Sequence, residues 1–249
     1  MMKYLLSAVF LYLLQIGYSQ DYEAVEPVIL INKPTAGTLL QGSFRANLLA
    51  YPDGGILAGL DAGVTDRLMF GISYGGTNVI GTGAVSWNPQ VGVNIRYRVI
   101  EEGYTNPAIA IGYDSQGYGS YIDSTKRYQE KSLGAFCVIS KNFSLLGILG
   151  LHGGVNYSFE REDDKSPNLF FGIDKSINPE LALACEYDFA LNDNEDDALG
   201  SGKGYLNASL HWTFAGRLRL DFILKNILKN RKDVPAMSRA IRISYIEIF

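Results

Sequence analysis

The feature that most constrains this chain is a strict alternation of apolar with polar or small residues. In the segment 217–225 every second residue is large and apolar: Leu218, Leu220, Phe222 and Leu224. Charged residues occupy the positions between them, with Ile223 as the one exception. Because side chains of a strand point alternately to its two faces, this period of two predicts strands with one apolar and one polar face.

Twelve segments follow this rule and lie near 38–50, 56–64, 67–76, 90–99, 107–115, 132–140, 145–158, 168–176, 180–191, 204–214, 217–226 and 237–249. Several connectors after odd-numbered segments are long (77–89, 116–131, 192–203 and 227–236), whereas those after even-numbered segments are short. Short turns between neighbouring strands favour antiparallel pairing. Long loops at one end and short turns at the other are typical of outer-membrane barrels.

The length of the segments separates a membrane barrel from a soluble β-sandwich. About ten residues are needed for a tilted strand to cross a bilayer, while strands of soluble proteins average about five to six. Aromatic residues also gather toward the ends of the apolar faces, as expected at the two membrane interfaces. They are Tyr51, Tyr74, Tyr113, Tyr157 and Phe189 at the long-loop end, and Tyr97, Phe214 and Phe249 at the other.

These patterns predict an all-β fold, a closed antiparallel transmembrane β-barrel of about twelve strands with up-and-down topology, over residues 38–249. A secreted soluble β protein is the alternative. Lipid offers no hydrogen bonds, so a sheet in a membrane must close on itself. We expect the barrel to face outer-membrane lipids.

The first residues predict export. Lys3 precedes an apolar run over 4–16, and Gly17 and Ser19 are small residues before a cleavage site. This layout predicts a signal peptide over 1–19, with an uncleaved membrane anchor as the alternative. The polar stretch 20–37, which contains two prolines, is expected to be a periplasmic lead-in. The predicted location is the bacterial outer membrane.

The last nine residues predict recognition by the machinery that inserts barrels. Ile241, Ile243, Tyr245 and Phe249 share one face. This resembles the C-terminal signature of bacterial outer-membrane proteins, a final aromatic behind alternating apolar residues. Glu247 departs from that pattern, because the face should be apolar there.

The polar faces define the expected lining of the lumen. The residues are Arg45, Asp61, Arg96, Arg98, Asp114, His152, Asp174, Glu186, Asp188, His211, Arg217, Arg219, Asp221, Lys225 and Arg242. Seven cationic and six acidic side chains nearly cancel. The residues fit either a lumen filled by paired charges or a narrow channel for small polar solutes. A twelve-stranded barrel is narrower than the open sixteen-stranded porins, which favours the filled lumen.

No catalytic residues, metal ligands or cofactors are predicted. Ser209 stands near His211, but no nucleophile motif surrounds it. An acidic stretch over 193–197 is expected to be a solvated loop rather than a cation site. Cys137 and Cys185 are expected to be free thiols facing lipid. With 22 Lys and Arg against 26 Asp and Glu, nothing suggests nucleic acid as a partner.

Residues 107–117 (Pro-Ala-Ile-Ala-Ile-Gly-Tyr-Asp-Ser-Gln-Gly) resemble a segment of the YjbH-like outer-membrane family, which is linked to exopolysaccharide production and export. The Gly-rich stretch 147–154 and the short segments 34–39, 132–133 and 140–141 also resemble this family. Members of that family are generally much longer and often carry a lipobox Cys, which this chain lacks. The resemblance implies a non-enzymatic component of exopolysaccharide export or envelope assembly, with polysaccharide as a partner. A surface adhesin or receptor acting through the outer loops is a further alternative.

Overall fold

The computed structural model describes residues 27–160, 162–195, 198–232 and 237–248. The predicted signal peptide and Phe249 lie outside these residues. Twelve long strands form the wall of a barrel. They are β1 (Ser43–Tyr51), β2 (Gly55–Thr65), β3 (Leu68–Thr77), β5 (Gly92–Ile100), β6 (Ala108–Asp114), β9 (Gly134–Ser144), β10 (Ile148–Tyr157), β11 (Asn168–Ser176), β12 (Leu181–Asp188), β13 (Tyr205–Phe214), β14 (Leu218–Lys225) and β15 (Ser238–Ile248).

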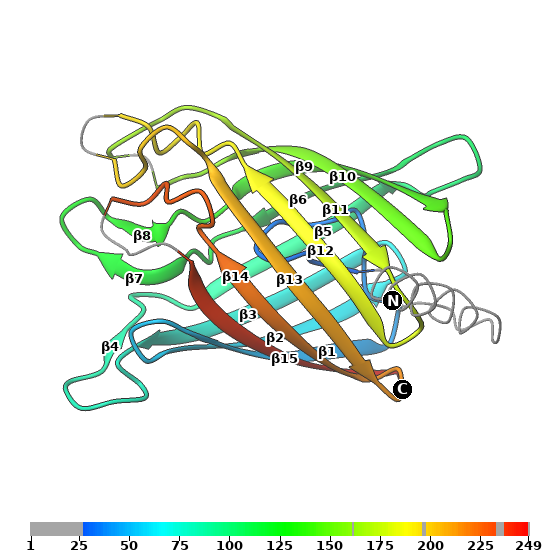
Figure 1. The fold of residues 1–249 in the computed structure, drawn as a ribbon, viewed down its shortest axis with the longest axis horizontal. Coiled ribbons are helices and arrows are strands. Elements are labelled where there is room, and N and C mark those ends of the chain that lie inside the picture. Colours follow the sequence, from blue (N-terminus) through cyan, green and yellow to red (C-terminus); the bar gives the residue numbers. More distant parts are fainter. Residues whose placement is uncertain (1–26, 161, 196–197, 233–236, 249) are drawn as a thin grey trace, which may run out of the picture.

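The sheet closes because the last strand pairs with the first. β15 is antiparallel to β1, and Ala46 lies opposite Tyr245 in that pair. Every other barrel strand pairs with its neighbours along the chain, so the up-and-down topology is confirmed (Figure 1). Closure satisfies the backbone N–H and C=O groups that an open edge would expose to lipid.

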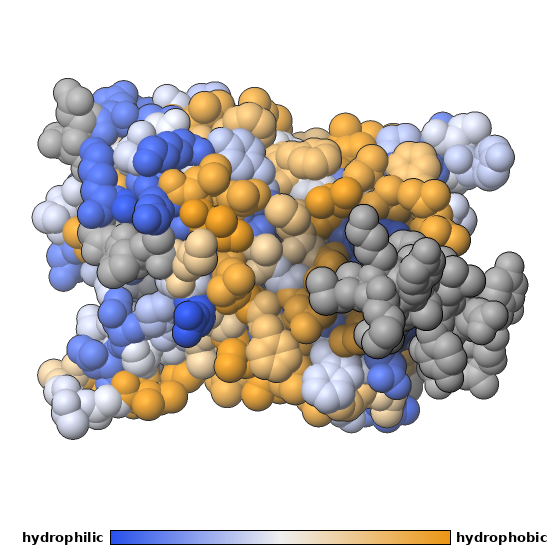
Figure 2. All heavy atoms as spheres, in the orientation of Figure 1, coloured by the Kyte–Doolittle hydropathy of each residue, from blue (hydrophilic) through white to orange (hydrophobic). Residues whose placement is uncertain are grey.

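The outward-facing positions form an apolar belt around the barrel. Side chains such as Leu60, Ile95 and Phe222 are between 43% and 48% exposed. Figure 2 shows the belt over the strands and hydrophilic residues beyond it at the loops. Such a surface is costly in water and favourable in hydrocarbon. Within the described part of the chain, no helix is long and apolar enough to cross a bilayer.

The two ends of the barrel differ, as the connectors indicated. The short-turn end holds the tight connections between β2 and β3, β9 and β10, β11 and β12, and β13 and β14. The connection between β5 and β6 also lies at the short-turn end, where Glu101 binds Arg67 of the β2–β3 turn. The long-loop end holds the remaining connections and three short strands that the sequence patterns did not indicate. These strands are β4 (Ser86–Trp87), β7 (Tyr118–Ile122) and β8 (Arg127–Glu130).

Among the described aromatic residues expected in the two girdles, all but Tyr51 face outward. Tyr74 and Tyr97 are more than 40% exposed, and Tyr74 stacks on Trp87 with ring centroids 5.8 Å apart. Tyr51, which we expected in the same girdle, instead points inward, and its hydroxyl donates to the Gly76 carbonyl at 3.0 Å. The two cysteines are free and half-buried on outward-facing positions.

The stretch expected to precede the barrel as a periplasmic lead-in is found, over its described residues 27–37, inside the barrel. Residues 28–36 form a tight hairpin, here called the inner hairpin, which lies between the front and rear walls in Figure 1. Backbone hydrogen bonds from Leu30 to Lys33 (3.0 Å) and from Thr35 to Val28 (3.2 Å) close the hairpin. Just after it, the Thr38 hydroxyl donates to the carbonyl of Asp66 in the turn between β2 and β3, so the hairpin enters from the short-turn end.

Apolar residues on the inner face of the wall hold the hairpin. Ile31 is fully buried against Leu49, Leu57 and Ile223, which explains why Ile223 breaks the alternation of its strand. On the other side Ala36 packs into a cluster with Ala108, Ala110, Leu133, Phe136, Val138 and Phe170. The lumen is therefore not uniformly polar, because part of its lining is the core that the hairpin completes.

One glycine of the wall makes room for the hairpin. A Cβ atom at Gly172 would stand 2.1 Å from Cδ1 of Leu30, which is 1% exposed. Only a residue without a side chain allows Leu30 to approach the backbone of β11 so closely. The hairpin therefore fits into a notch in the wall.

Candidate functional site: the closed lumen

The carboxylate of Glu186, on β12, is the centre of the hairpin contacts. It is fully buried and accepts backbone hydrogen bonds from Ile31 (3.1 Å), Asn32 (2.9 Å) and Lys33 (2.9 Å). The side-chain amide of Asn207 donates a further bond at 2.9 Å. Successive N–H groups at the tip of the hairpin form a concave anion site, and these donors satisfy the buried carboxylate oxygens.

Three arginines hold the carbonyl groups of the same segment. Arg96, on β5, donates from Nη1 to the carbonyls of Val28 (2.6 Å) and Gly37 (2.7 Å). Arg98 donates to Ala36 at 3.0 Å. Arg242, on β15, donates from Nη2 to Ile31 at 2.7 Å. The wall therefore satisfies the polar backbone of the hairpin, which would otherwise lose hydrogen bonds on leaving water.

A buried Ser–His–Asp chain contacts the hairpin as well. Ser140 Oγ lies 2.7 Å from His152 Nδ1, and His152 Nε2 lies 2.7 Å from Asp174 Oδ1. In a neutral imidazole facing a carboxylate that only accepts, Nε2 would carry the proton and Nδ1 would accept from the serine hydroxyl. Ser140 is 1% exposed, and its oxygen accepts the N–H of Ala36 at 2.8 Å.

Ser140, His152 and Asp174 resemble a hydrolytic triad only in residue composition. In serine hydrolases the hydroxyl contacts Nε2 and the acid contacts Nδ1, which is the reverse of the contacts made here. The serine oxygen is also buried beneath the hairpin, where it already accepts the N–H of Ala36. We therefore assign these three residues a structural role, in which Ser140 anchors the backbone of Ala36.

Further lumenal charges pair along the wall. Arg45 donates to Asp61 at 2.7 Å, and Asp61 also accepts from Asn94 at 2.9 Å. Asp221 is fully buried and accepts from Arg219 at 2.6 Å. These pairs line the wall beside the hairpin, which shows how a narrow lumen accommodates many charges.

Asp221 also has a histidine partner. His211 Nδ1 lies 2.7 Å from Asp221 Oδ1, and Arg242 Nη1 lies 3.6 Å from the other carboxylate oxygen. Ser209 Oγ approaches the same His211 nitrogen at 3.3 Å. Because the serine and the acid both contact Nδ1, this cluster does not form a relay through the ring.

Three loops close the long-loop end over the hairpin. Arg127, on β8, is 1% exposed and contacts Asp163 and Asp193, the latter at 2.6 Å. Lys131 binds Asp163 at 2.6 Å, and Tyr205 donates to Asp193 at 2.6 Å. We call these five residues the outer cap. Asp193 was expected in a solvated loop, but the cap buries its carboxylate because Arg127 and Tyr205 supply partners.

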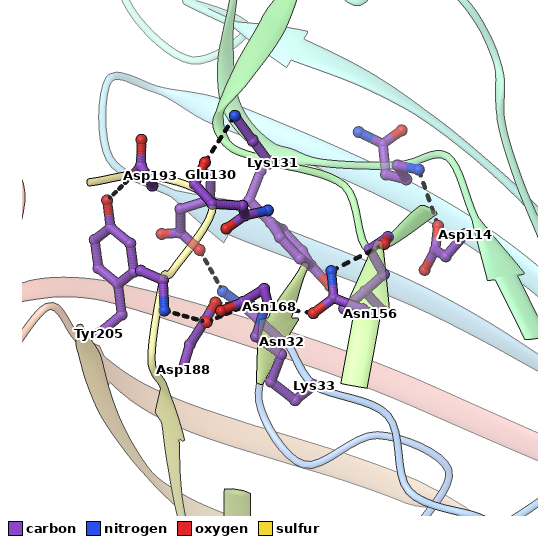
Figure 3. Close-up of a pocket in the computed structure, with 15 residues that line it drawn as sticks. Asn32, Lys33, Asp114, Glu130, Lys131, Asn156, Asn168, Asp188, Asp193 and Tyr205 are labelled. Atoms are coloured by element: carbon purple, nitrogen blue, oxygen red, sulfur yellow. Dashed lines mark hydrogen bonds and ion pairs between the residues drawn. The ribbon is translucent and has the colours of Figure 1, made fainter. Parts of the chain in front are cut away.

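The hairpin and the loops beneath the cap meet in a small polar pocket (Figure 3). Lys33 forms an ion pair with Asp188 at 2.5 Å, and the Asn32 amide donates to Glu130 at 2.6 Å. Glu130 also pairs with Lys225 at 2.8 Å. The pocket has room for little more than a single water molecule, so the hairpin and the loops fill this part of the lumen.

Fourteen of the fifteen residues predicted for the lumen lie on its wall, and Arg217 does not. Arg217 lies in the turn between β13 and β14, where 61% of its side chain is exposed, and it binds Glu247 at 2.7 Å. The alternation of β14 does not continue through the turn, which is why the prediction failed. The pair also explains the charge in the C-terminal signature, since Glu247 has a cation beside it. Ile241, Ile243 and Tyr245 face outward.

Sequence reasoning missed the inner hairpin and most of the outer cap. The hairpin residues have no period of two, and their prolines are typical of a linker. The one available signal was the set of apolar residues on polar faces, Leu49, Leu57, Phe136, Val138, Phe170 and Ile223, which need an apolar partner inside the barrel.

Three solved structures are similar to this chain, and the first of them supports the fold. The "KdgM porin" has a TM-score of 0.53 and 10% identity over 83% of this chain and 99% of its own. An outer-membrane channel from Pseudomonas putida F1 has a TM-score of 0.43 and 13% identity over 93% of this chain and all of its own. Omp33 of Acinetobacter baumannii has a TM-score of 0.42 and 7% identity over 84% and 98% of the two chains.

No protein-family profile matches the chain, and no curated protein sequence matches it. The YjbH-like resemblance is therefore not confirmed. The fold is that of a closed, twelve-stranded antiparallel barrel of the outer-membrane porin type.

Proposed function

We propose that this protein is a bacterial outer-membrane barrel that forms a narrow channel for small polar solutes and that its inner hairpin closes the channel at rest. The observation that carries the proposal is the way the hairpin is held. It is not a strand of the sheet, and most of its polar contacts join its own backbone to wall side chains such as Glu186, Arg96 and Arg242. Contacts of this kind can be exchanged for water or a solute without opening the barrel.

The porin-type fold and the paired charges of the wall support a polar path. With the hairpin withdrawn, arginines on β5 and β15 would face the carboxylates of β12 across the lumen. Opposed charges of this kind select small polar or charged solutes. A polysaccharide chain fits the structure less well, because the pocket between the hairpin and the loops has room for little more than a water molecule.

The test is conductance in a planar bilayer. Wild-type protein is expected to show rare, brief openings, and a variant lacking residues 27–37 is expected to show long-lived conductance steps. Gly172→Val gives the same test without a deletion, since it removes the space for Leu30 and leaves every wall charge in place. If neither variant conducts more than wild type, the hairpin does not close a channel.

A permanently closed envelope component is the second candidate, and the outer cap favours it. Arg127 joins three loops over the mouth and could keep the barrel closed even without the hairpin. Combining Arg127→Ala with the deletion distinguishes the two functions. Conductance in the double variant alone would assign closure to the cap, and conductance in neither variant would favour a structural role.

A further inference from the structure

We propose that the outward face of β11–β15 carries a binding site for a phosphate-bearing glycolipid of the outer leaflet, the lipid A portion of lipopolysaccharide, with one acyl chain in a wall groove and a phosphate on Arg239. The inference rests on the outer-membrane location proposed above. It does not depend on whether the lumen conducts.

The first observation is an unpaired cation on the lipid-facing surface. Arg239 is the second residue of β15, exposed, on the same face as Ile241 and Ile243. Among the described residues it has no hydrogen-bond or ion-pair partner. The cost of a charge on this face falls toward the interface, and Arg239 lies at the long-loop end of its strand. A guanidinium there binds an anion favourably, and lipid phosphate is an anion present at that depth.

The other charged side chains near the apolar belt differ, because the protein itself supplies their partners. Arg217, at the opposite end of the barrel, binds Glu247. Lys175 donates to the carbonyls of Leu146 (2.6 Å) and Ser176 (2.8 Å). Unlike Arg217, which has a carboxylate partner, and Lys175, which has carbonyl partners, Arg239 has neither among the described residues.

The second observation is a groove that begins beside Arg239. It has a volume of about 690 Å³, which is within the roughly 300–1,000 Å³ range of ligand-binding clefts. The strand register explains why the groove exists. Outward-facing residues that lie opposite one another on neighbouring strands form a row across β11–β15, and two side chains in one such row are small. That row runs through Arg239, Leu224, Ala208, Cys185 and Ile173.

Larger side chains border this row. The neighbouring row runs through Ile241, Phe222, Leu210, Leu183 and Lys175. Phe222, Leu183 and Ile241 are each between 44% and 49% exposed and form one side of the groove. Because the strands of a barrel are tilted, a row that follows the hydrogen bonds crosses the membrane obliquely. The groove therefore descends from the headgroup level at Arg239 into the hydrocarbon, which is the path of an acyl chain.

The source of the lipid follows from the end of the barrel at which Arg239 lies. The long-loop end faces outward in barrels of this type. In the bacterial outer membrane, lipid A provides the phosphates of that outer leaflet. Phosphatidylethanolamine carries a cationic amine beside its phosphate and offers a weaker counter-charge to an arginine.

The experiment measures lipid retention by native mass spectrometry of the full-length protein in detergent, titrated separately with lipid A, phosphatidylglycerol and phosphatidylethanolamine. Wild type is expected to retain lipid A most strongly. Arg239→Gln is expected to weaken that binding about five-fold, the effect of losing one cation near a charged membrane surface. Ala208→Phe, which fills the groove and leaves Arg239 in place, is expected to weaken it as well.

The matched control is Arg217→Gln, which removes a cation that already has a protein partner. It should bind lipid A as wild type does. Unchanged binding by Arg239→Gln would overturn the site, and so would equal retention of the three lipids by wild type. A preference for phosphatidylglycerol over lipid A would overturn the assigned source. If the protein failed to insert into liposomes, the proposed location would be wrong, so the two failures are distinguishable.

Discussion

Replacing Glu186 by Gln should release the inner hairpin without disturbing the barrel. The side chains have nearly the same shape, but the carboxylate accepts three backbone N–H groups from residues 31–33. A hydrogen bond to a charged acceptor contributes about 1.5–3 kcal/mol, against about 0.5–1.5 kcal/mol for a neutral one. Three bonds that each lose about 1 kcal/mol give a gross loss of about 3 kcal/mol.

Part of this loss is offset, because a neutral amide costs less to bury than a carboxylate. We therefore expect the free energy of hairpin docking to fall by about 2 kcal/mol. Since 1.36 kcal/mol corresponds to a factor of ten, the population of the open hairpin should rise roughly 30-fold.

Amide hydrogen exchange measures this population directly, because an N–H exchanges only when its hydrogen bond opens. In Glu186→Gln the amides of residues 31–33 should lose protection by that factor, while amides in the strands β1 and β15 keep theirs. Glu101→Gln is the matched control, since Glu101 binds Arg67 at 2.8 Å in an exposed pair outside the lumen. Unchanged protection at residues 31–33 would refute the assigned role of Glu186.

Two further predictions concern the notch and the cap. Gly172→Ala should lower the hydrogen-exchange protection of the hairpin amides, because the added Cβ would stand 2.1 Å from Leu30 Cδ1. Leu30→Ala in the same chain should restore part of that protection, since it removes the contact. An additive loss in the double variant would contradict the proposed packing of Leu30 against Gly172. Burial alone would raise the pKa of Asp163, but hydrogen bonds from Lys131 and Arg127 outweigh it and hold the pKa below its usual value of 3.8. The contribution of Asp163 to the stability of the cap is then complete above about pH 4 and is lost as the pH falls through its lowered pKa. The hydrogen-exchange protection of the cap loops should therefore decrease in that pH range in wild type. In Asp163→Asn this protection should be independent of pH.

Much of the wall followed from local sequence alone. In a barrel, neighbours along the chain are neighbours in the sheet, so the alternation and the connector lengths specify both strand pairing and the facing of each residue. That is why the alternation by itself assigns Arg96, Glu186 and Asp221 to the lumen. The prediction failed where the alternation ended, as at Arg217, or where an inward residue was not polar, as at Tyr51.

The contents of the lumen were decided by tertiary structure. The inner hairpin lies more than 150 residues from Glu186 and more than 200 from Arg242 along the chain. Nothing in a short polar segment with two prolines shows that it will be buried, because much of its backbone is satisfied by side chains of distant strands. The period of two determined which side chains face inward. What they would meet there, a segment of the same chain rather than water, depended on closing the sheet around it.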